Sequence, residues 1–287
     1  MATTTQDRVA ELRRLATKTR RLIVETIYSV KAGHVGGPLS AADILVALYF
    51  DVMRIDPRRP DWEDRDRFIL SKGHSALAQY TVLALRGYLP VEELATFDHL
   101  GTRLHGHPDM KLLPGIEMST GSLGQGLSPG VGMALGAKIA GKDFRTYVMI
   151  GDGEAQEGQI WEAALVAQRY ALDNLTAILD WNNLQQNGFW PERISDWPAR
   201  QRQPTDRPHE KFAAFGWAVK EIDGHDMEEI LDAFAWAKTI TGQPQVIIAR
   251  TVKGKGVSYM ENRPEWHAKV PTDQELAIAR AELPVDE

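Results

Sequence analysis

The sequence predicts an α/β fold with a doubly wound, mostly parallel sheet and helices on both faces of that sheet. The clearest evidence is one strand–helix–strand unit, in which apolar runs at residues 146–153 and 175–182 flank a helical pattern at 161–172. Both runs are nearly continuous, which is typical of strands buried on both faces of a parallel sheet. A chain of 287 residues in this architecture commonly folds around one core, so we expect a single domain over residues 1–287.

The amino-terminal segments predict three helices and one strand. Apolar residues recur at helical spacing over residues 9–30, and Gly33 is placed to end that first helix. A second helix is expected to begin with Ser40 as its N-cap. Residues 67–75 then predict a short buried strand with a polar turn, and residues 79–88 predict a helix.

Two irregular stretches interrupt the regular elements. Residues 100–130 are rich in Gly, Pro and His and predict a long loop, and residues 189–209 carry four prolines and predict an exposed excursion. The remaining expected elements are a helix at 130–141, a strand at 217–223, a helix at 226–240 with Asp226 and Glu229 as a capping box, a strand at 244–252, and one helix after His267.

Composition excludes several classes of function. Apolar residues make up 43% and charged residues 25%, which is ordinary for a globular protein. The net charge is −6 and the basic residues are spread along the chain, so we expect no nucleic-acid surface. The absence of cysteine excludes disulfides and thiolate sites and favours the cytoplasm. No secretory signal or apolar run of about 18 residues is present, so we expect no membrane association.

The strongest functional signal is a pair of polar motifs at the ends of consecutive predicted strands. Gly151-Asp152-Gly153 follows one strand, and Asn182-Asn183 follows the next. Because ligands bind beyond the carboxyl ends of parallel strands, both motifs face the same region. Asp152, Asn182 and the Leu184 carbonyl offer the oxygen ligands that Mg²⁺ prefers. Gly153 would let a backbone N–H approach a phosphate. The motifs therefore predict a site for an Mg²⁺-bound diphosphate.

Each motif also has a simpler interpretation when it stands alone. A lone GDG motif is more often only a turn, and a lone NN motif is more often only a strand-end cap. The pairing of the two motifs on consecutive strands favours a diphosphate site. Other phosphate motifs fit less well. The spacing of Gly153 and Gly158 resembles a Walker motif, but Gln159 stands where a lysine is required. No glycine cluster completes the G-x-G-x-x-G pattern before a helix, so ATP and NAD are disfavoured.

Eight segments follow one another along the chain and carry a resemblance to a known family. They are GHVGGPLSAADILVALYF, RFILSKGHS, LHGHPD, STGSLGQGLSPGVGMALGAK, GDGEAQEGQIWEA, DWNNLQQNG, FGWAVKEIDGHD and TVKGKGVSYMENRPEWH. In this order they resemble the amino-terminal half of transketolases over roughly residues 20 to 270, and the paired motifs resemble those of thiamine-diphosphate enzymes. The resemblance implies thiamine diphosphate as the cofactor, with Mg²⁺ as the metal and Ca²⁺ or Mn²⁺ as substitutes.

The resemblance also implies roles for individual residues. The cofactor contacts would be His74, Gly121, Leu123, Gly153, Asp180, Asn182 and His267, and the metal ligands Asp152, Asn182 and Leu184. The catalytic residues would be His34, His107, His267 and Glu157. Imidazole suits proton transfer at sugar hydroxyls because its pKa lies near neutral pH. Glu157 matches a residue at the subunit boundary, although it could be only a favourable first-turn acid. His105 could be only a neighbour of His107.

The family also uses a pyrimidine-binding domain with a catalytic glutamate and a carboxy-terminal domain, and neither resembles any part of this sequence. We therefore expect a split enzyme, in which a partner subunit carries these domains and two copies of each chain form an α2β2 heterotetramer. The expected activity is transfer of a two-carbon ketol unit from a ketose, expected to be phosphorylated, to an aldehyde. Alternatives are a subunit of a 2-oxo acid dehydrogenase or synthase, and a non-catalytic regulatory subunit.

Overall fold

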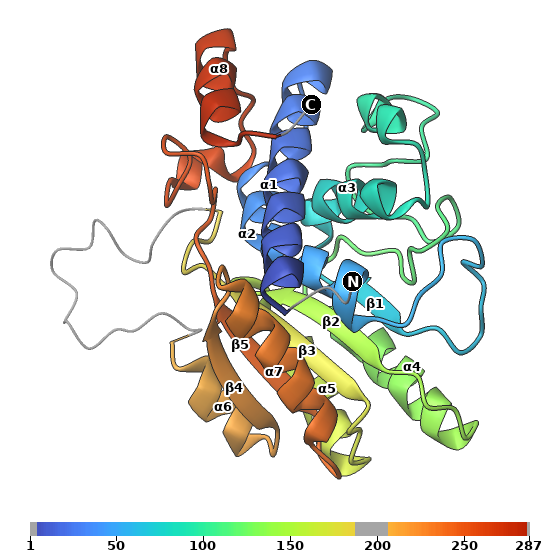
Figure 1. Cartoon of the computed structure of the whole chain (residues 1–287). Helices are drawn as coiled ribbons and strands as arrows, with labels where there is room; N and C mark the ends of the chain where they lie inside the picture. The colour runs from blue at the N-terminus through green and yellow to red at the C-terminus, as the bar shows by residue number, and fades with distance from the viewer. Residues whose placement is uncertain (1–4, 187–205, 286–287) are drawn as a thin grey trace, which may run out of the picture.

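The structure is a computed structural model, and it describes residues 5–186 and 206–285. Within these residues the strands form one five-stranded sheet in the order β1-β2-β3-β5-β4, and every neighbouring pair is parallel (Figure 1). The strands are β1 (Arg67–Leu70), β2 (Thr146–Gly151), β3 (Leu175–Trp181), β4 (Ala218–Asp223) and β5 (Gln245–Arg250). The predicted parallel sheet is confirmed.

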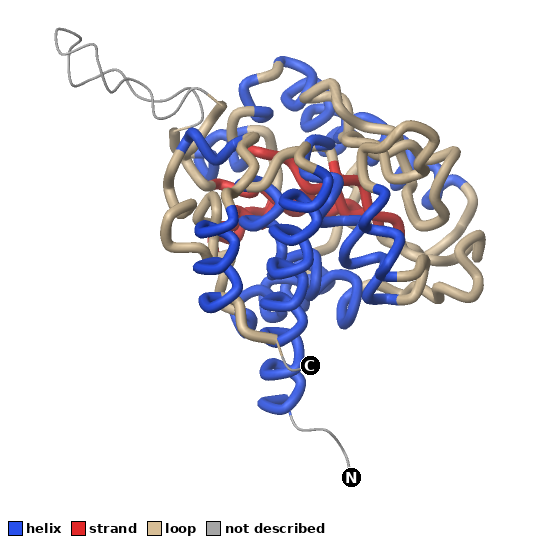
Figure 2. The backbone as a smooth tube through the Cα atoms, turned by 90° about the horizontal axis from the view of Figure 1, so that it is seen from above, coloured by secondary structure: helices blue, strands red, loops and turns tan. Residues whose placement is uncertain are grey.

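Helices cover both faces of the sheet, as predicted for a doubly wound fold. One hydrophobic core involves α1 (Thr5–Val30), α2 (Gly36–Ala47), α3 (Ala76–Arg86) and α7 (Met227–Thr239). The other involves α4 (Leu127–Ile139), α5 (Gly158–Arg169) and α6 (Pro208–Ala214). Figure 2 shows the strands running between these helices. The last helix, α8 (Asp273–Glu282), packs on α1. None of the described helices is both long enough and apolar enough to span a bilayer.

Short helical turns and one long loop connect these elements. The turns lie at Leu48–Val52, where α2 widens into a π-helical turn, and at Gly73–Ser75, Val91–Thr96, Glu154–Gln156 and Pro264–His267. Between the third of these turns and α4 the chain forms loop and turns, so the predicted loop is present but ends at α4 rather than at residue 130. This loop approaches the carboxyl ends of the strands, because the Thr120 hydroxyl donates a hydrogen bond to the Leu70 carbonyl, 2.7 Å away.

The expected start of the second helix was wrong. The helix begins at Gly36, and Ser40 is a buried residue inside its second turn rather than an N-cap. Pro38 fits the first turn because the N–H it lacks has no partner inside a helix at that position. The Ser40 hydroxyl instead donates to the Gly37 carbonyl at 2.9 Å and lies 2.7 Å from an Asp180 carboxylate oxygen. Ser40 therefore joins α2 to β3.

Two other predicted details differ from the structure. Asp226 caps α7 by accepting hydrogen bonds from the Glu228 and Glu229 amides, but the Glu229 carboxylate accepts from the Asp223 amide instead of returning to Asp226. The expected capping box is thus only half formed. The predicted excursion at 189–209 lies mostly outside the described residues, and its last two residues belong to α6, whose first residue is Pro208. Proline favours a helix start because its φ angle is already helical.

The glycines of α4 offer a test of how this helix packs. A Cβ added at Gly130 would overlap the Val148 side chain of β2, whereas one added at Gly136 would meet nothing within 4 Å. We expect Gly130→Ala to lower the free energy of unfolding by about 1–3 kcal/mol. The control Gly136→Ala should raise it by up to about 1 kcal/mol, because alanine favours helix. Urea unfolding measures both, and equal effects would contradict this packing.

Candidate active site

The described part of the chain has a cavity of about 340 Å³ at the carboxyl ends of β2 and β3. The sequence-predicted residues that line it are His34, His74, Gly121, Leu123, Asp152, Gly153, Asn182, Leu184 and His267. A larger cavity of about 620 Å³ lies between α1 and the residues after α8, and none of the predicted site residues lines it. The smaller cavity is the candidate site because polar groups from distant segments converge there.

The pairing of β2 with β3 brings the two polar motifs together. In this parallel pair Gly151 lies opposite Asp180, so Asp152 and Asn182 follow neighbouring strands at the same edge of the sheet. Both side chains are buried, with 5% of Asp152 and 8% of Asn182 exposed. The juxtaposition predicted from the sequence is therefore present in the fold.

Asp152 carries an incomplete set of hydrogen bonds. One carboxylate oxygen accepts from the Gly153 amide at 2.7 Å, and the other is buried without a hydrogen-bond partner among the described residues. Burial, together with the nearby Asp180 charge, raises the pKa of Asp152 to about 6. A buried carboxylate oxygen without a donor is costly unless a cation satisfies it. This oxygen fits a metal ligand.

The residues after β3 form a tight turn that offers further oxygens. The Leu184 amide donates to the Asn182 side-chain oxygen at 3.0 Å, and Asn183 between them has a left-handed φ of 59°. The Leu184 carbonyl accepts from the Lys253 ammonium at 3.2 Å, so this carbonyl already faces a cation. The described residues contain no cluster of three or more His, Cys, Asp or Glu side chains suited to a metal. A metal here would instead combine one carboxylate, one amide and one carbonyl.

Two lysines that the sequence analysis did not select also line the cavity. Lys72 is 2% exposed and Lys253 is 3% exposed. Lys253 lies 2.8 Å from the His267 ring nitrogen Nδ1, and burial lowers the pKa of its ammonium to about 8. Two buried ammonium groups beside one cavity are suited to a polyanion such as a diphosphate. The available signal was their position inside segments that resemble transketolases, two residues before His74 and two residues after Thr251.

Asp180, which the resemblance implies as a cofactor contact, is not among the residues that line the cavity. It is fully buried below the site, where it forms an ion pair with Lys72 and accepts a hydrogen bond from the Thr251 hydroxyl. Burial alone would raise its pKa, but the Lys72 charge and the hydrogen bonds outweigh that effect and lower it. Asp180 therefore orients Lys72 rather than facing the cavity itself.

Glu154 is another residue that the sequence analysis missed. Its carboxylate accepts from the Gly124 amide at 2.9 Å, from the Gly151 amide at 3.0 Å and from the Ser71 hydroxyl. It is 2% exposed and lines the cavity. The contacts tie the long loop and the end of β1 to the end of β2. Glu154 thus holds together the segments that form one wall of the site.

Four histidines from different segments gather at the cavity, and three of them line it. His34 lies 5.2 Å from His74, 5.0 Å from His267 and 6.2 Å from His107, measured between ring centroids. Burial is the main cause that lowers the pKa of three of these rings, to about 2 for His74 and about 3 for His267, and it also lowers the pKa of His34. These rings are neutral at pH 7, and a neutral imidazole can donate one hydrogen bond and accept another.

Two further predicted residues, and His105, lie beside the cavity rather than in its lining. His107 lies next to Gly121, which lines the cavity: the His107 ring would be the nearest group to a Cβ added at Gly121. With His34, it also lines a neighbouring hollow of about 550 Å³ that includes His105. Glu157 is exposed at the residue before α5 and caps no amide with its side chain. Its position leaves it available to another chain but outside this cavity.

The neutral histidines predict how stability depends on pH. An unfolded histidine takes up a proton below about pH 6.5, whereas folded His74 remains neutral, so the free energy of unfolding should fall as the pH drops. His74→Gln removes this proton uptake. Between pH 7 and pH 5 the wild-type chain should lose about 2 kcal/mol more stability than the variant. Urea unfolding across this range measures the difference, and identical losses would contradict a buried neutral ring.

Comparison with known proteins identifies the family. The family model described as transketolase, thiamine diphosphate binding domain, matches residues 12–287. The chain is 44% identical to one of the subunits of the apulose-4-phosphate transketolase of Phocaeicola vulgatus, over 93% of this chain and 91% of that protein. It is also 44% identical to a 6-deoxy-6-sulfo-D-fructose transketolase subunit of Clostridium sp., over 95% of this chain and 96% of that protein.

Solved structures agree with this match. The transketolase of Leishmania mexicana aligns with a TM-score of 0.86 at 33% identity, covering 96% of this chain and 41% of that one. The transketolase of Campylobacter jejuni aligns with a TM-score of 0.86 at 33% identity, covering 96% and 43%. The chain thus spans less than half of these solved transketolases, but nearly all of the subunit relatives. It belongs to the transketolase family, and its fold is that family's thiamine-diphosphate-binding domain.

Proposed function

We propose that this chain binds thiamine diphosphate with Mg²⁺ and acts in the cytoplasm, together with a partner subunit, as a transketolase. The reaction would transfer a two-carbon ketol unit from a ketose, expected to be phosphorylated, to an aldehyde. The observation that carries the proposal is the buried oxygen of Asp152 beside Asn182 at the ends of β2 and β3, which has no hydrogen-bond partner within residues 5–186 and 206–285. A bound cation would satisfy this oxygen and at the same time hold phosphate groups.

The metal and the diphosphate would be held by different groups of this chain. Asp152, Asn182 and the Leu184 carbonyl are the proposed ligands of Mg²⁺, with Ca²⁺ or Mn²⁺ as possible replacements. His74, Gly153 and His267 are the proposed diphosphate contacts, and the geometry adds Lys72 and Lys253. The two ammonium groups would offset the charge of the phosphates. Gly121 and the partly exposed Leu123 are the proposed contacts of the cofactor's rings.

The histidines would act on the sugar. When bound, thiamine diphosphate supplies the nucleophilic carbon that makes cleavage beside a ketose carbonyl feasible. The neutral rings of His34 and His267, together with the His107 side chain, would orient the hydroxyl groups of the donor. A ring nitrogen that carries no hydrogen can accept a hydroxyl proton and return it later. Four clustered imidazoles favour a polyhydroxylated substrate over a 2-oxo acid, which argues against the dehydrogenase or synthase alternative.

A partner subunit would complete the site. The subunit relatives match this chain over nearly their whole length, whereas the solved transketolases are more than twice as long as the matched part. The partner would carry the pyrimidine-binding domain and the catalytic glutamate, in an α2β2 assembly. Exposed apolar side chains on α4, on α5 and at the residue after α5 support a covered surface there, and exposed Glu157 is the residue before α5. They are Ile139, Leu165, Val166 and Tyr170.

Replacing Asp152 tests the metal site. Loss of a group that is only hydrogen-bonded to a metal ligand typically weakens metal binding roughly 10–100-fold. Asp152 is a proposed ligand itself, so we expect Asp152→Ala to weaken Mg²⁺-dependent binding of thiamine diphosphate by more than this. Isothermal titration calorimetry measures this affinity. Asp232→Ala, at an exposed position of α7, is the matched control and should bind like the wild type. Unchanged affinity in Asp152→Ala would remove the basis of the proposed site.

Reconstitution tests the activity and the need for a partner. The chain alone, supplied with thiamine diphosphate, Mg²⁺ and a ketose donor, should show no turnover, and addition of a subunit that carries the pyrimidine-binding domain should restore it. The same pair should act on a ketose but not on pyruvate. Turnover by the chain alone would refute the split-enzyme proposal. Activity on pyruvate would favour the dehydrogenase or synthase class, and a reconstituted pair that acts on neither would favour a regulatory subunit.

A further inference from the structure

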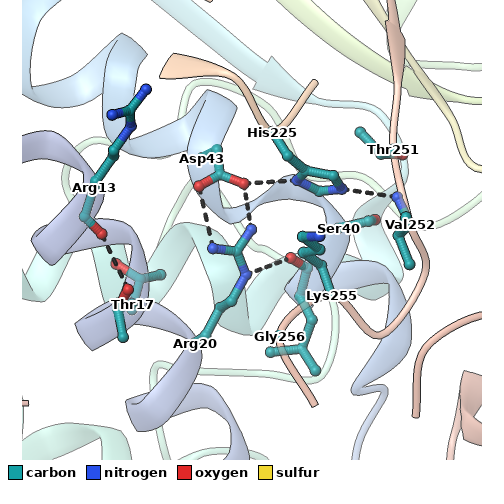
Figure 3. A network of polar contacts seen from close by, with 12 residues as sticks. Arg13, Thr17, Arg20, Ser40, Asp43, His225, Thr251, Val252, Lys255 and Gly256 are labelled. Atoms are coloured by element: carbon teal, nitrogen blue, oxygen red, sulfur yellow. Dashed lines mark hydrogen bonds and ion pairs between the residues drawn. The ribbon is translucent and has the colours of Figure 1, made fainter. Parts of the chain in front are cut away.

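The loop between β4 and α7 carries a histidine that the proposed function leaves unused. His225 belongs to the segment FGWAVKEIDGHD, and only 10% of its side chain is exposed. Its Nδ1 lies 2.7 Å from an Asp43 oxygen on α2, and its Nε2 accepts a hydrogen bond from the Val252 amide at 2.8 Å (Figure 3). The ring therefore bridges a helix and the segment that follows β5.

The direction of both hydrogen bonds is determined by their partners. A backbone amide can only donate, so Nε2 carries no hydrogen and Nδ1 donates to Asp43. Asp43 is a stable anchor for this donor, because both of its oxygens also contact the Arg20 guanidinium. Burial alone would raise the pKa of Asp43, but the Arg20 charge and the His225 hydrogen bond lower it to about 2.

The backbone of Gly224, the residue before His225, packs closely against the end of β5. The Gly224 amide donates to the Arg250 carbonyl at 2.7 Å. A Cβ added at Gly224 would lie 2.5 Å from the Thr251 side chain, so a larger residue would force this loop away. The missing side chain of Gly224 thus lets this loop lie close to the end of β5. At this distance the next residue, His225, accepts the hydrogen bond from the Val252 amide.

The restrained segment leads directly into the candidate active site. Thr251 donates to Asp180, which pairs with Lys72. Lys253 lines the cavity and contacts the Leu184 carbonyl and His267. Val252 lies between Thr251 and Lys253, and its amide is the group that His225 holds. A shift of this backbone would move Lys253 and disturb the Thr251 hydrogen bond to Asp180, the ion-pair partner of Lys72.

We infer that His225 is a positioning residue, which holds the Thr251–Lys253 segment at the cofactor site through its hydrogen bond from the Val252 amide. The inference rests on the proposed function, because it names a further residue on which diphosphate binding depends. It also distinguishes the two ring nitrogens: the Nε2 contact serves the site, and the Nδ1 contact only anchors the ring to Asp43.

Two substitutions separate these contacts. His225→Gln places an amide oxygen near the position of Nε2 and can still accept from Val252, whereas His225→Asn places its amide near Nδ1 and keeps only the Asp43 contact. We expect His225→Asn to raise the Kd for thiamine diphosphate with Mg²⁺ about tenfold, which is the size of one lost hydrogen bond. We expect His225→Gln to stay within about twofold of the wild type. Calorimetry on the full chain measures both.

Hydrogen exchange provides a readout that does not depend on the cofactor. The Val252 amide should exchange at least about tenfold faster in His225→Asn than in the wild type or in His225→Gln. The inference would be overturned if both variants bound thiamine diphosphate as tightly as the wild type. It would also be overturned if both variants lost the same amount of affinity, or if only His225→Gln lost affinity. If the wild type itself fails to bind thiamine diphosphate, the proposed function is wrong. Independently of the cofactor, an unchanged exchange rate of the Val252 amide in His225→Asn would show that His225 does not hold the segment.

Discussion

The parallel pairing of β2 with β3 is the constraint on which the site depends. Its register places Gly151 opposite Asp180, and each strand then continues into a polar residue at the same edge of the sheet. Both strands are buried by helices on two faces, so a shift of register would expose apolar residues and is strongly disfavoured. The stability of the core therefore determines the geometry at which Asp152 and Asn182 meet.

The three buried carboxylates around this edge differ in how fully they are paired or hydrogen-bonded. Asp180 is matched by Lys72, and Glu154 is matched by two backbone amides and a hydroxyl. Asp152 keeps one free buried oxygen among the described residues, which is the feature expected of a preformed cation site. Lys253, which also lines the cavity, would supply positive charge for an anion that the metal would also hold. The structure thus resembles a site prepared in advance for a metal-bound diphosphate.

The clustered histidines depend on a different part of the fold. They come from loops and turns that converge on one place, and burial keeps the affected rings neutral. The segment that carries Lys253 is held from outside the cavity, by the bridge through His225 to Asp43 and Arg20. The proposed cofactor binding and sugar recognition therefore rely on connections to α1 and α2 as well as on the sheet.

The sequence by itself determined the parallel sheet, its two helical layers and the position of Asp152 and Asn182, because these follow from local apolar runs and strand ends. Periodicity could not show that α2 begins before Ser40, where Pro38 occupies its first turn. Nor could it show that the Glu229 carboxylate accepts a hydrogen bond from Asp223 at the end of β4. Only the tertiary structure revealed the contacts of Lys72, Glu154, Lys253 and His225, and the burial of Asp180 below the cavity. Each of these depends on partners far away in the chain, and a local pattern holds no information about which distant groups will pack together.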